Sequence, residues 1–265
     1  MSSIVRPTPA QRTRRLVVLA AAVFAVVAPL VQNLAGLGLT QAEFAADGNS
    51  TLRVAGYAFS IWGLIYLGVL AYAVRQVLPQ TGESTVINRM GWPSAVAFVG
   101  IGLWIIVAAM NLTAASVMII FAALLALLVP MLAIARPIRS LSRFDRDRLL
   151  AVWPLAALAG WLTVASPLNL ITTLTAFNAL PAALSPTGWA VVAIVAVVVV
   201  AVAVAAVLRT LAYPLPVAWG LLGAFVAEQA DNPVVGFTAL AGAVLVLLAG
   251  LALTFRLRPG VERAV

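Results

Sequence analysis

Cysteine, histidine and lysine are absent from this chain of 265 residues. Without cysteine there are no disulfides and no thiolate nucleophiles, and without histidine there is no imidazole base and no axial histidine for haem. Zinc sites built from these two residue types are excluded as well. We therefore expect a protein that is not an enzyme and that holds neither a metal nor a covalently bound cofactor.

Charge is also scarce, since only 9% of the residues are charged while 64% are hydrophobic. The mean hydropathy is +1.11. Soluble domains carry roughly a quarter charged residues, so most of this protein's surface must face lipid rather than water. The composition predicts an integral membrane protein.

The long uncharged stretches indicate how often the chain crosses the membrane, because about 20 apolar residues span the hydrocarbon core. Two of the stretches are long enough to fold back on themselves. One is interrupted at 111–113 and the other by turn-forming residues at 178–188. The sequence therefore predicts an all-α, polytopic membrane helix bundle with eight transmembrane helices, drawn from residues 16–42, 54–74, 90–135, 149–208, 210–227 and 232–255.

All sixteen basic residues are arginine, and their positions orient the spans, because cytoplasmic loops are enriched in basic residues. With the N-terminus inside, fifteen of them fall in inner segments and only Arg53 falls in an outer one. Glu43, Asp47, Glu228 and Asp231 also fall on the outer side. We expect a bacterial inner-membrane protein with both termini in the cytoplasm.

The net charge of +8 does not indicate a nucleic-acid partner. The arginines form short clusters at helix ends, with no soluble domain to present them. The clusters at 12–15 and 136–148 suit anionic lipids of the inner leaflet instead. The expected partners are the lipid bilayer and a small hydrophobic ligand. A second copy of the chain, in a homodimer, is a further candidate partner.

No ionisable residue lies in the middle of a span, which disfavours ion coupling through a buried carboxylate. Glu228, one turn from the end of its span, is interpreted as a boundary residue of the outer face. Aromatic and amide side chains recur at helical spacing on the second and fifth spans, and such a face suits a flat conjugated ligand. Packing alone remains an equal alternative for the two deep indoles. The candidate site residues are Phe59, Trp62, Tyr66, Trp161, Ala165 and Asn169.

The same residues resemble motifs of the TspO/MBR family, the tryptophan-rich sensory proteins related to the translocator or peripheral benzodiazepine receptor. Trp62 and Tyr66, preceded by Phe59, match the second helix of that family, and Trp161 followed by Ala165 and Asn169 matches the fifth. The resemblance implies a five-helix core, residues 1–177, enclosing a pocket for porphyrins or other flat hydrophobic ligands. Residues 178–265 would add three further helices to the same bundle.

These observations leave three candidate functions, which we rank in order. The first is a membrane sensor or receptor-like protein that binds a tetrapyrrole or a similar planar ligand among the first five helices. The alternative is a permease for a neutral or amphipathic small molecule, favoured by eight spans and by prolines within them. A porphyrin-modifying enzyme ranks last, because no histidine, cysteine or buried acid is present to transfer protons.

Overall fold

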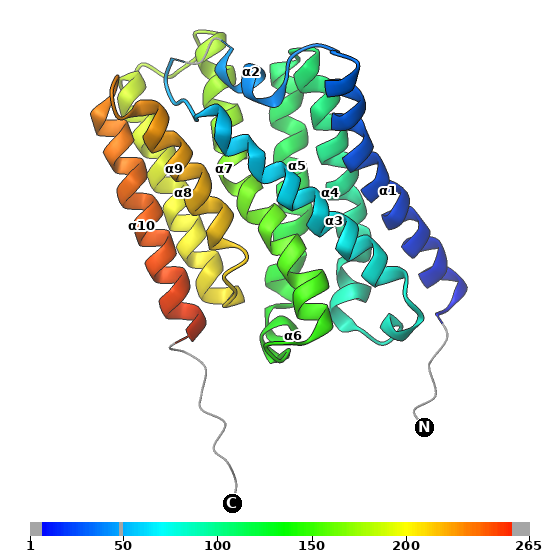
Figure 1. The fold of residues 1–265 in the computed structure, drawn as a ribbon. Helices are drawn as coiled ribbons and strands as arrows, with labels where there is room; N and C mark the ends of the chain where they lie inside the picture. The colour runs from blue at the N-terminus through cyan, green and yellow to red at the C-terminus, as the bar shows by residue number, and fades with distance from the viewer. Residues whose placement is uncertain (1–6, 48–49, 256–265) are drawn as a thin grey trace, which may run out of the picture.

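Eight long helices lie side by side in the computed structural model, which describes residues 7–47 and 50–255 (Figure 1). Within these residues the chain forms helices and no strands. Seven of the long helices are long and apolar enough to cross a membrane, and α9 is a shorter apolar helix. The predicted helical membrane bundle is confirmed. The long helices are α1 (Pro9–Leu34), α3 (Ile61–Val77), α4 (Thr85–Ala109), α5 (Thr113–Ala133), α7 (Trp153–Ala176), α8 (Pro186–Leu208), α9 (Pro214–Glu228) and α10 (Pro233–Phe255).

Short helical segments connect the long ones at the two ends of the bundle. The α-helical segments are α2 (Gln41–Ala46) and α6 (Ala135–Ser140), the 3-10 segments are η1 (Gly56–Ser60) and η2 (Pro79–Thr81), and η3 (Arg148–Val152) is a π-helical turn. α2 lies at the opposite end of the bundle from α6 (Figure 1). The first residues of α1 and the last residues of α10 share the end at which α6 lies.

α7 is the central helix of the bundle (Figure 1). In its most apolar stretch 78% of the residues are buried, against 33–50% in the other six helices that are long enough to span a membrane. It packs against α3, α5, α8 and α9. Side chains of α7 can therefore face an enclosed interior, whereas those six helices must offer much of their surface to lipid.

The turns predicted inside the two longest apolar stretches are present. Asn111 and Asn178 adopt positive φ angles of 55° and 52°, a conformation that asparagine tolerates better than most residues. Ser185 then caps α8 by accepting a hydrogen bond from the backbone N–H of Gly188 at 3.1 Å. These local signals end and restart the helices where the sequence indicated.

The first span differs from the prediction of 16–42. α1 begins at Pro9, because Thr8 and Gln11 form a capping box at its start. It ends at Leu34, and the chain beyond it turns through Gly36 and Gly38, whose φ angles are +61° and +65°. The helix therefore starts seven residues earlier and ends eight residues earlier than hydropathy alone suggested.

The early start of α1 places Arg14 and Arg15 inside the helix, where both side chains are buried. Arg14 donates hydrogen bonds to the carbonyl oxygen and to Oδ1 of Asn88 at 2.9 and 2.7 Å. Arg15 donates to Oγ1 of Thr81 at 2.9 Å. Arg14 thus fixes α1 to the first turn of α4, and Arg15 fixes it to the connection between α3 and α4.

α7 and α9 approach each other closely at two glycines. The backbone of Gly160 lies directly against the carbonyl oxygen of Tyr213, and Gly220 lies against the side chain of Val164. A Cβ atom at either glycine would collide with its neighbour. Small residues at such crossings let membrane helices pack by close backbone contact.

Candidate ligand-binding site

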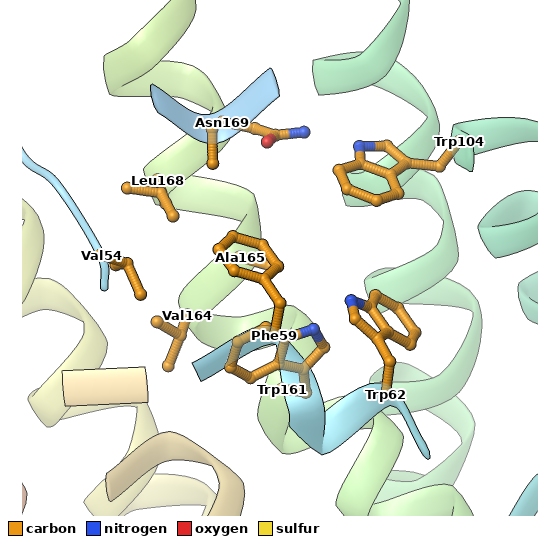
Figure 2. Close-up of a pocket in the computed structure, with 10 residues that line it drawn as sticks. Val54, Phe59, Trp62, Trp104, Trp161, Val164, Ala165, Leu168 and Asn169 are labelled. Atoms are coloured by element: carbon orange, nitrogen blue, oxygen red, sulfur yellow. The ribbon is translucent and has the colours of Figure 1, made fainter. Parts of the chain in front are cut away.

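A small cavity lies between α3, α4 and α7, toward the end of the bundle where α2 lies (Figure 2). Four aromatic rings and one amide form much of its wall, and aliphatic side chains complete it. η1 supplies one ring, and α3, α4 and α7 supply one indole each. The lining residues are Ala45, Val54, Phe59, Trp62, Trp104, Trp161, Val164, Ala165, Leu168 and Asn169.

Trp62 is the centre of the aromatic cluster. Its ring stacks on Tyr66 at a centroid distance of 5.3 Å and on Trp104 at 6.2 Å. Trp161 meets it edge-on at 6.2 Å, and Phe59 meets Trp161 edge-on at 6.1 Å. Such stacked and edge-on pairs are the geometries that aromatic rings prefer, so the cluster holds its rings in defined orientations.

The polar atoms of this cluster are buried without hydrogen-bond partners among the described residues. They are the indole Nε1 atoms of Trp62, Trp104 and Trp161 and the hydroxyl of Tyr66. Figure 2 shows the three indole nitrogens on the sides of their rings that face the cavity. A buried donor without an acceptor costs about 1–3 kcal/mol. Several unpartnered donors around one cavity therefore indicate that an acceptor group from outside the described residues belongs there.

Indoles elsewhere in the bundle do not share this feature. The Nε1 atom of Trp189 donates to the carbonyl oxygen of Pro181 at 2.8 Å, and that of Trp219 donates to the carbonyl oxygen of Ala58 at 2.8 Å. The fold is thus able to satisfy partly buried indoles with backbone carbonyls. The unpartnered donors are a property of the cavity and not of tryptophan in this bundle generally.

Asn169 contributes an amide at the cavity wall and joins α7 to α5. Its Nδ2 donates to Oγ of Ser116 at 3.3 Å, and the Ser116 hydroxyl donates to the carbonyl oxygen of Thr113 at 2.7 Å. This chain of hydrogen bonds fixes the orientation of the amide beside the aromatic rings.

The cavity is nearly closed in this conformation. The space left inside it is about 10 Å³, which is about the least that one water molecule needs. Sites for drug-sized ligands usually enclose about 300–1,000 Å³. A planar ligand can therefore enter only when lining side chains, or the segments that carry them, move outward.

The segment that carries Val54 covers the cavity and is fixed to α9. The backbone N–H and Nε of Arg53 both donate to Oε1 of Glu228, at 2.7 and 3.1 Å, and Nη2 of Arg53 contacts Asp231 at 2.7 Å. The backbone N–H of Ala55 donates to the carbonyl oxygen of Gly223 at 3.0 Å. The hydrogen bonds to Glu228 and then to Asp231 raise the pKa of the Arg53 guanidinium. We call residues 50–55 the cover segment.

Glu228 was interpreted from the sequence as a boundary residue of the outer face. It does lie at that end of its helix, but its side chain is only 2% exposed. It is buried because it receives Arg53 from a loop 175 positions away in the chain. α9 and the turn after it thus hold the segment that closes a cavity lined mainly by α3, α4 and α7.

α2 supports the cavity from the same end. Thr40 and Glu43 form its capping box, and the backbone N–H of Thr40 lowers the pKa of the Glu43 carboxyl. Phe44 packs edge-on against Trp104 at a centroid distance of 5.9 Å. Asp47 accepts a hydrogen bond from Nδ2 of Asn111 at 2.6 Å, which connects α2 to the turn between α4 and α5.

The structure brings most of the predicted site residues to one place. Phe59, Trp62, Trp161, Ala165 and Asn169 all line the cavity, and Tyr66 lies behind Trp62. Trp104 was not among the predicted site residues. Trp104 lies five residues before the end of α4, where an interfacial tryptophan is common, so no signal in the sequence singled it out.

Comparison with known proteins supports the resemblance read from the motifs. No curated protein and no solved structure matches the chain. A family model described as TSPO-like protein matches residues 14–252. The motif resemblance concerned the first five long helices, and the matched range continues through α8, α9 and most of α10. The chain, an integral membrane bundle with an indole-lined cavity, belongs to the TSPO-like protein family.

Proposed function

We propose that this protein is a membrane sensor or receptor-like protein that binds a flat hydrophobic ligand bearing acceptor oxygens, such as a porphyrin, in the indole-lined cavity. The observation that carries the proposal is the set of buried, unpartnered donors from Trp62, Trp104, Trp161 and Tyr66. Membership of the TSPO-like family supports a sensor or receptor-like role in general.

Each part of the ligand has a counterpart in the cavity wall. Trp62 and Trp104 stack on each other at 6.2 Å, and a conjugated ring would stack between their faces once the two indoles move apart. The indole N–H groups can donate to a carbonyl or carboxylate oxygen of the ligand. The described lining residues carry no charged side chain, so recognition relies on shape, stacking and neutral hydrogen bonds. We propose binding without catalysis.

The orientation of the protein defines how the ligand arrives. The end that contains Arg14, Arg15 and the 136–148 connection is proposed to face the cytoplasm, as the positive-inside rule predicts. The cavity then lies nearer the outer face, beneath α2 and the cover segment. A ligand would reach it from the outer side of a bacterial inner membrane when the cover segment moves.

A titration with protoporphyrin IX tests the proposal. The porphyrin's own absorbance reports binding, so that replacing tryptophans does not change the readout. Trp62→Phe combined with Trp161→Phe keeps two aromatic rings and removes two donors, each worth about 1 kcal/mol. We expect affinity to fall about thirtyfold. Trp92→Phe, at an exposed position outside the cavity, is the matched control and should bind as wild type.

A second ligand separates hydrogen bonding from hydrophobic uptake. Octaethylporphyrin has the same flat ring without carboxylates, and it should bind more weakly than protoporphyrin IX to the wild type. The double variant keeps the indole donor of Trp104, so it should prefer protoporphyrin IX over octaethylporphyrin less strongly than the wild type does. Equal affinity of the wild type for both ligands, or a double variant indistinguishable from Trp92→Phe, would refute the assignment of the site.

A further inference from the structure

A second cavity lies at the arginine-rich end of the bundle, away from the indole-lined site. It is formed by the connection before α7, the first turn of α7, the turn between α8 and α9, and the end of α10. Its volume is about 90 Å³, several times what one water molecule requires. The lining residues are Arg143, Arg148, Trp153, Thr210, Leu211, Thr254 and Phe255.

Two threonine hydroxyls in this wall are buried and lack a hydrogen-bond partner within the described residues. The exposed fractions of Thr210 and Thr254 are 1% and 8%. Several helical threonines of this protein donate to the carbonyl oxygen four residues earlier, as Thr163, Thr175 and Thr238 do at 2.6–2.8 Å. Thr254 is helical too but does not form this bond. The wall of this cavity thus contains two hydroxyl donors without an acceptor among the described residues.

The charge beside these hydroxyls is positive. Arg148 is buried and donates to the carbonyl oxygens of Leu141 and Arg209 at 3.1 and 3.3 Å, which holds its guanidinium at the cavity wall. Arg143 is exposed and lies over the ring of Phe255 at 5.6 Å. The described lining residues include no acid. Two guanidinium groups together with two hydroxyl donors form a donor set suited to an oxyanion.

From these observations we infer that this cavity is a binding site for a phosphate group. A phosphate offers several acceptor oxygens, enough to satisfy both threonine hydroxyls and to pair with the arginines. The position favours a lipid headgroup as the source, because Trp153 and Phe255 are exposed beside the cavity at an end rich in arginine. The acyl chains of such a lipid would lie along the apolar surface that begins at Leu149 and Leu150, which are also exposed.

Native mass spectrometry of the full-length protein in detergent tests this inference. Phosphatidylglycerol and diacylglycerol are added separately, since they share acyl chains and differ in the phosphate headgroup. We expect one tightly held phosphatidylglycerol per chain and no comparable retention of diacylglycerol. Thr210→Val with Thr254→Val should weaken phosphatidylglycerol binding at least tenfold. Thr238→Val, at a threonine already bonded within α10, is the matched control and should have no effect.

A second pair of variants keeps the test valid if the double threonine variant fails to fold. Arg143→Gln changes an exposed lining residue and should weaken binding, whereas Arg146→Gln changes an exposed arginine of the same connection that does not line the cavity. If inorganic phosphate binds to the wild type and displaces the lipid, the cavity is still a phosphate-binding site, but its ligand is soluble phosphate. Equal retention of both lipids, or equal binding by Arg143→Gln and Arg146→Gln, would overturn the inference.

Discussion

Replacing Glu228 with glutamine should loosen the cover segment over the indole-lined cavity. The substitution keeps the size of the side chain and one carbonyl oxygen for the backbone N–H of Arg53, but it removes the charge that pairs with the guanidinium. Three hydrogen bonds from Arg53 to Glu228 are affected, at 2.7, 3.1 and 3.2 Å. This contact joins the cover segment to α9, so its loss should show as easier opening of the cover segment.

The magnitude follows from the exposure of the two partners. Hydrogen bonds to a charged group are worth about 1.5–3 kcal/mol and neutral ones about 0.5–1.5 kcal/mol. Glu228 is buried, but the side chain of Arg53 is 36% exposed and also contacts Asp231, so water and Asp231 replace part of the lost interaction. We therefore expect the closed position of the cover segment to be weakened by about 1–2 kcal/mol.

Hydrogen exchange measured by mass spectrometry reports this change directly. The amides of Arg53 and Ala55 are both bonded to α9, and a peptide covering 50–60 contains them. A weakening of about 1–2 kcal/mol corresponds to exchange about five to thirty times faster. Protoporphyrin IX should also associate faster, because Val54 of the cover segment lines the cavity.

Asp231→Asn is the matched control for Glu228→Gln. Asp231 also contacts Arg53, but its side chain is 68% exposed, and exposed ion pairs contribute little. Exchange in the same peptide should rise about twofold or less. The reasoning would be refuted by a Glu228→Gln protein whose 50–60 peptide exchanges at the wild-type rate, or by an equal effect of Asp231→Asn.

Three further substitutions test other parts of the account. Trp104→Phe removes an unpartnered indole donor and should weaken protoporphyrin IX binding about fivefold in the absorbance titration, while an unchanged affinity would exclude Trp104 from the site. Gly160→Ala places a Cβ against the carbonyl oxygen of Tyr213 and should destabilise the bundle by about 1–3 kcal/mol in denaturant unfolding; wild-type stability would show that α7 and α9 do not meet there. Tyr213→Phe removes the 2.7 Å hydroxyl contact with Thr163 and should cost about 1 kcal/mol in the same assay, and no loss would argue against that contact.

The number of helices could be predicted from the sequence because lipid imposes a strong and local requirement. Every span needs a long uncharged stretch, and the asparagines at 111 and 178 interrupt the two stretches that are too long. The start of α1 was predicted less well, because a capping box at Thr8 extends the helix into a polar region that hydropathy treats as a loop.

The candidate site was predictable where helical spacing alone brings residues together. Trp62 and Tyr66 share a face of α3, and Trp161, Ala165 and Asn169 share a face of α7, so their proximity within each helix follows from the period. The pairing of Arg53 with Glu228 joins residues 175 positions apart and leaves no local signal in the sequence. The role of α9 in holding the cover segment could therefore be found only from the tertiary structure.

The central claim is that the cavity's indole N–H groups bind the acceptor oxygens of a ligand, and the indole signals of ¹⁵N-tryptophan-labelled protein test it most directly. The chain has seven tryptophans, which single Trp→Phe variants can assign. On adding protoporphyrin IX, the Nε1–H signals of Trp62, Trp104 and Trp161 should shift, while those of Trp189 and Trp219, already bonded to carbonyl oxygens, should stay in place. Unchanged signals from the three cavity indoles at saturating porphyrin would contradict the account.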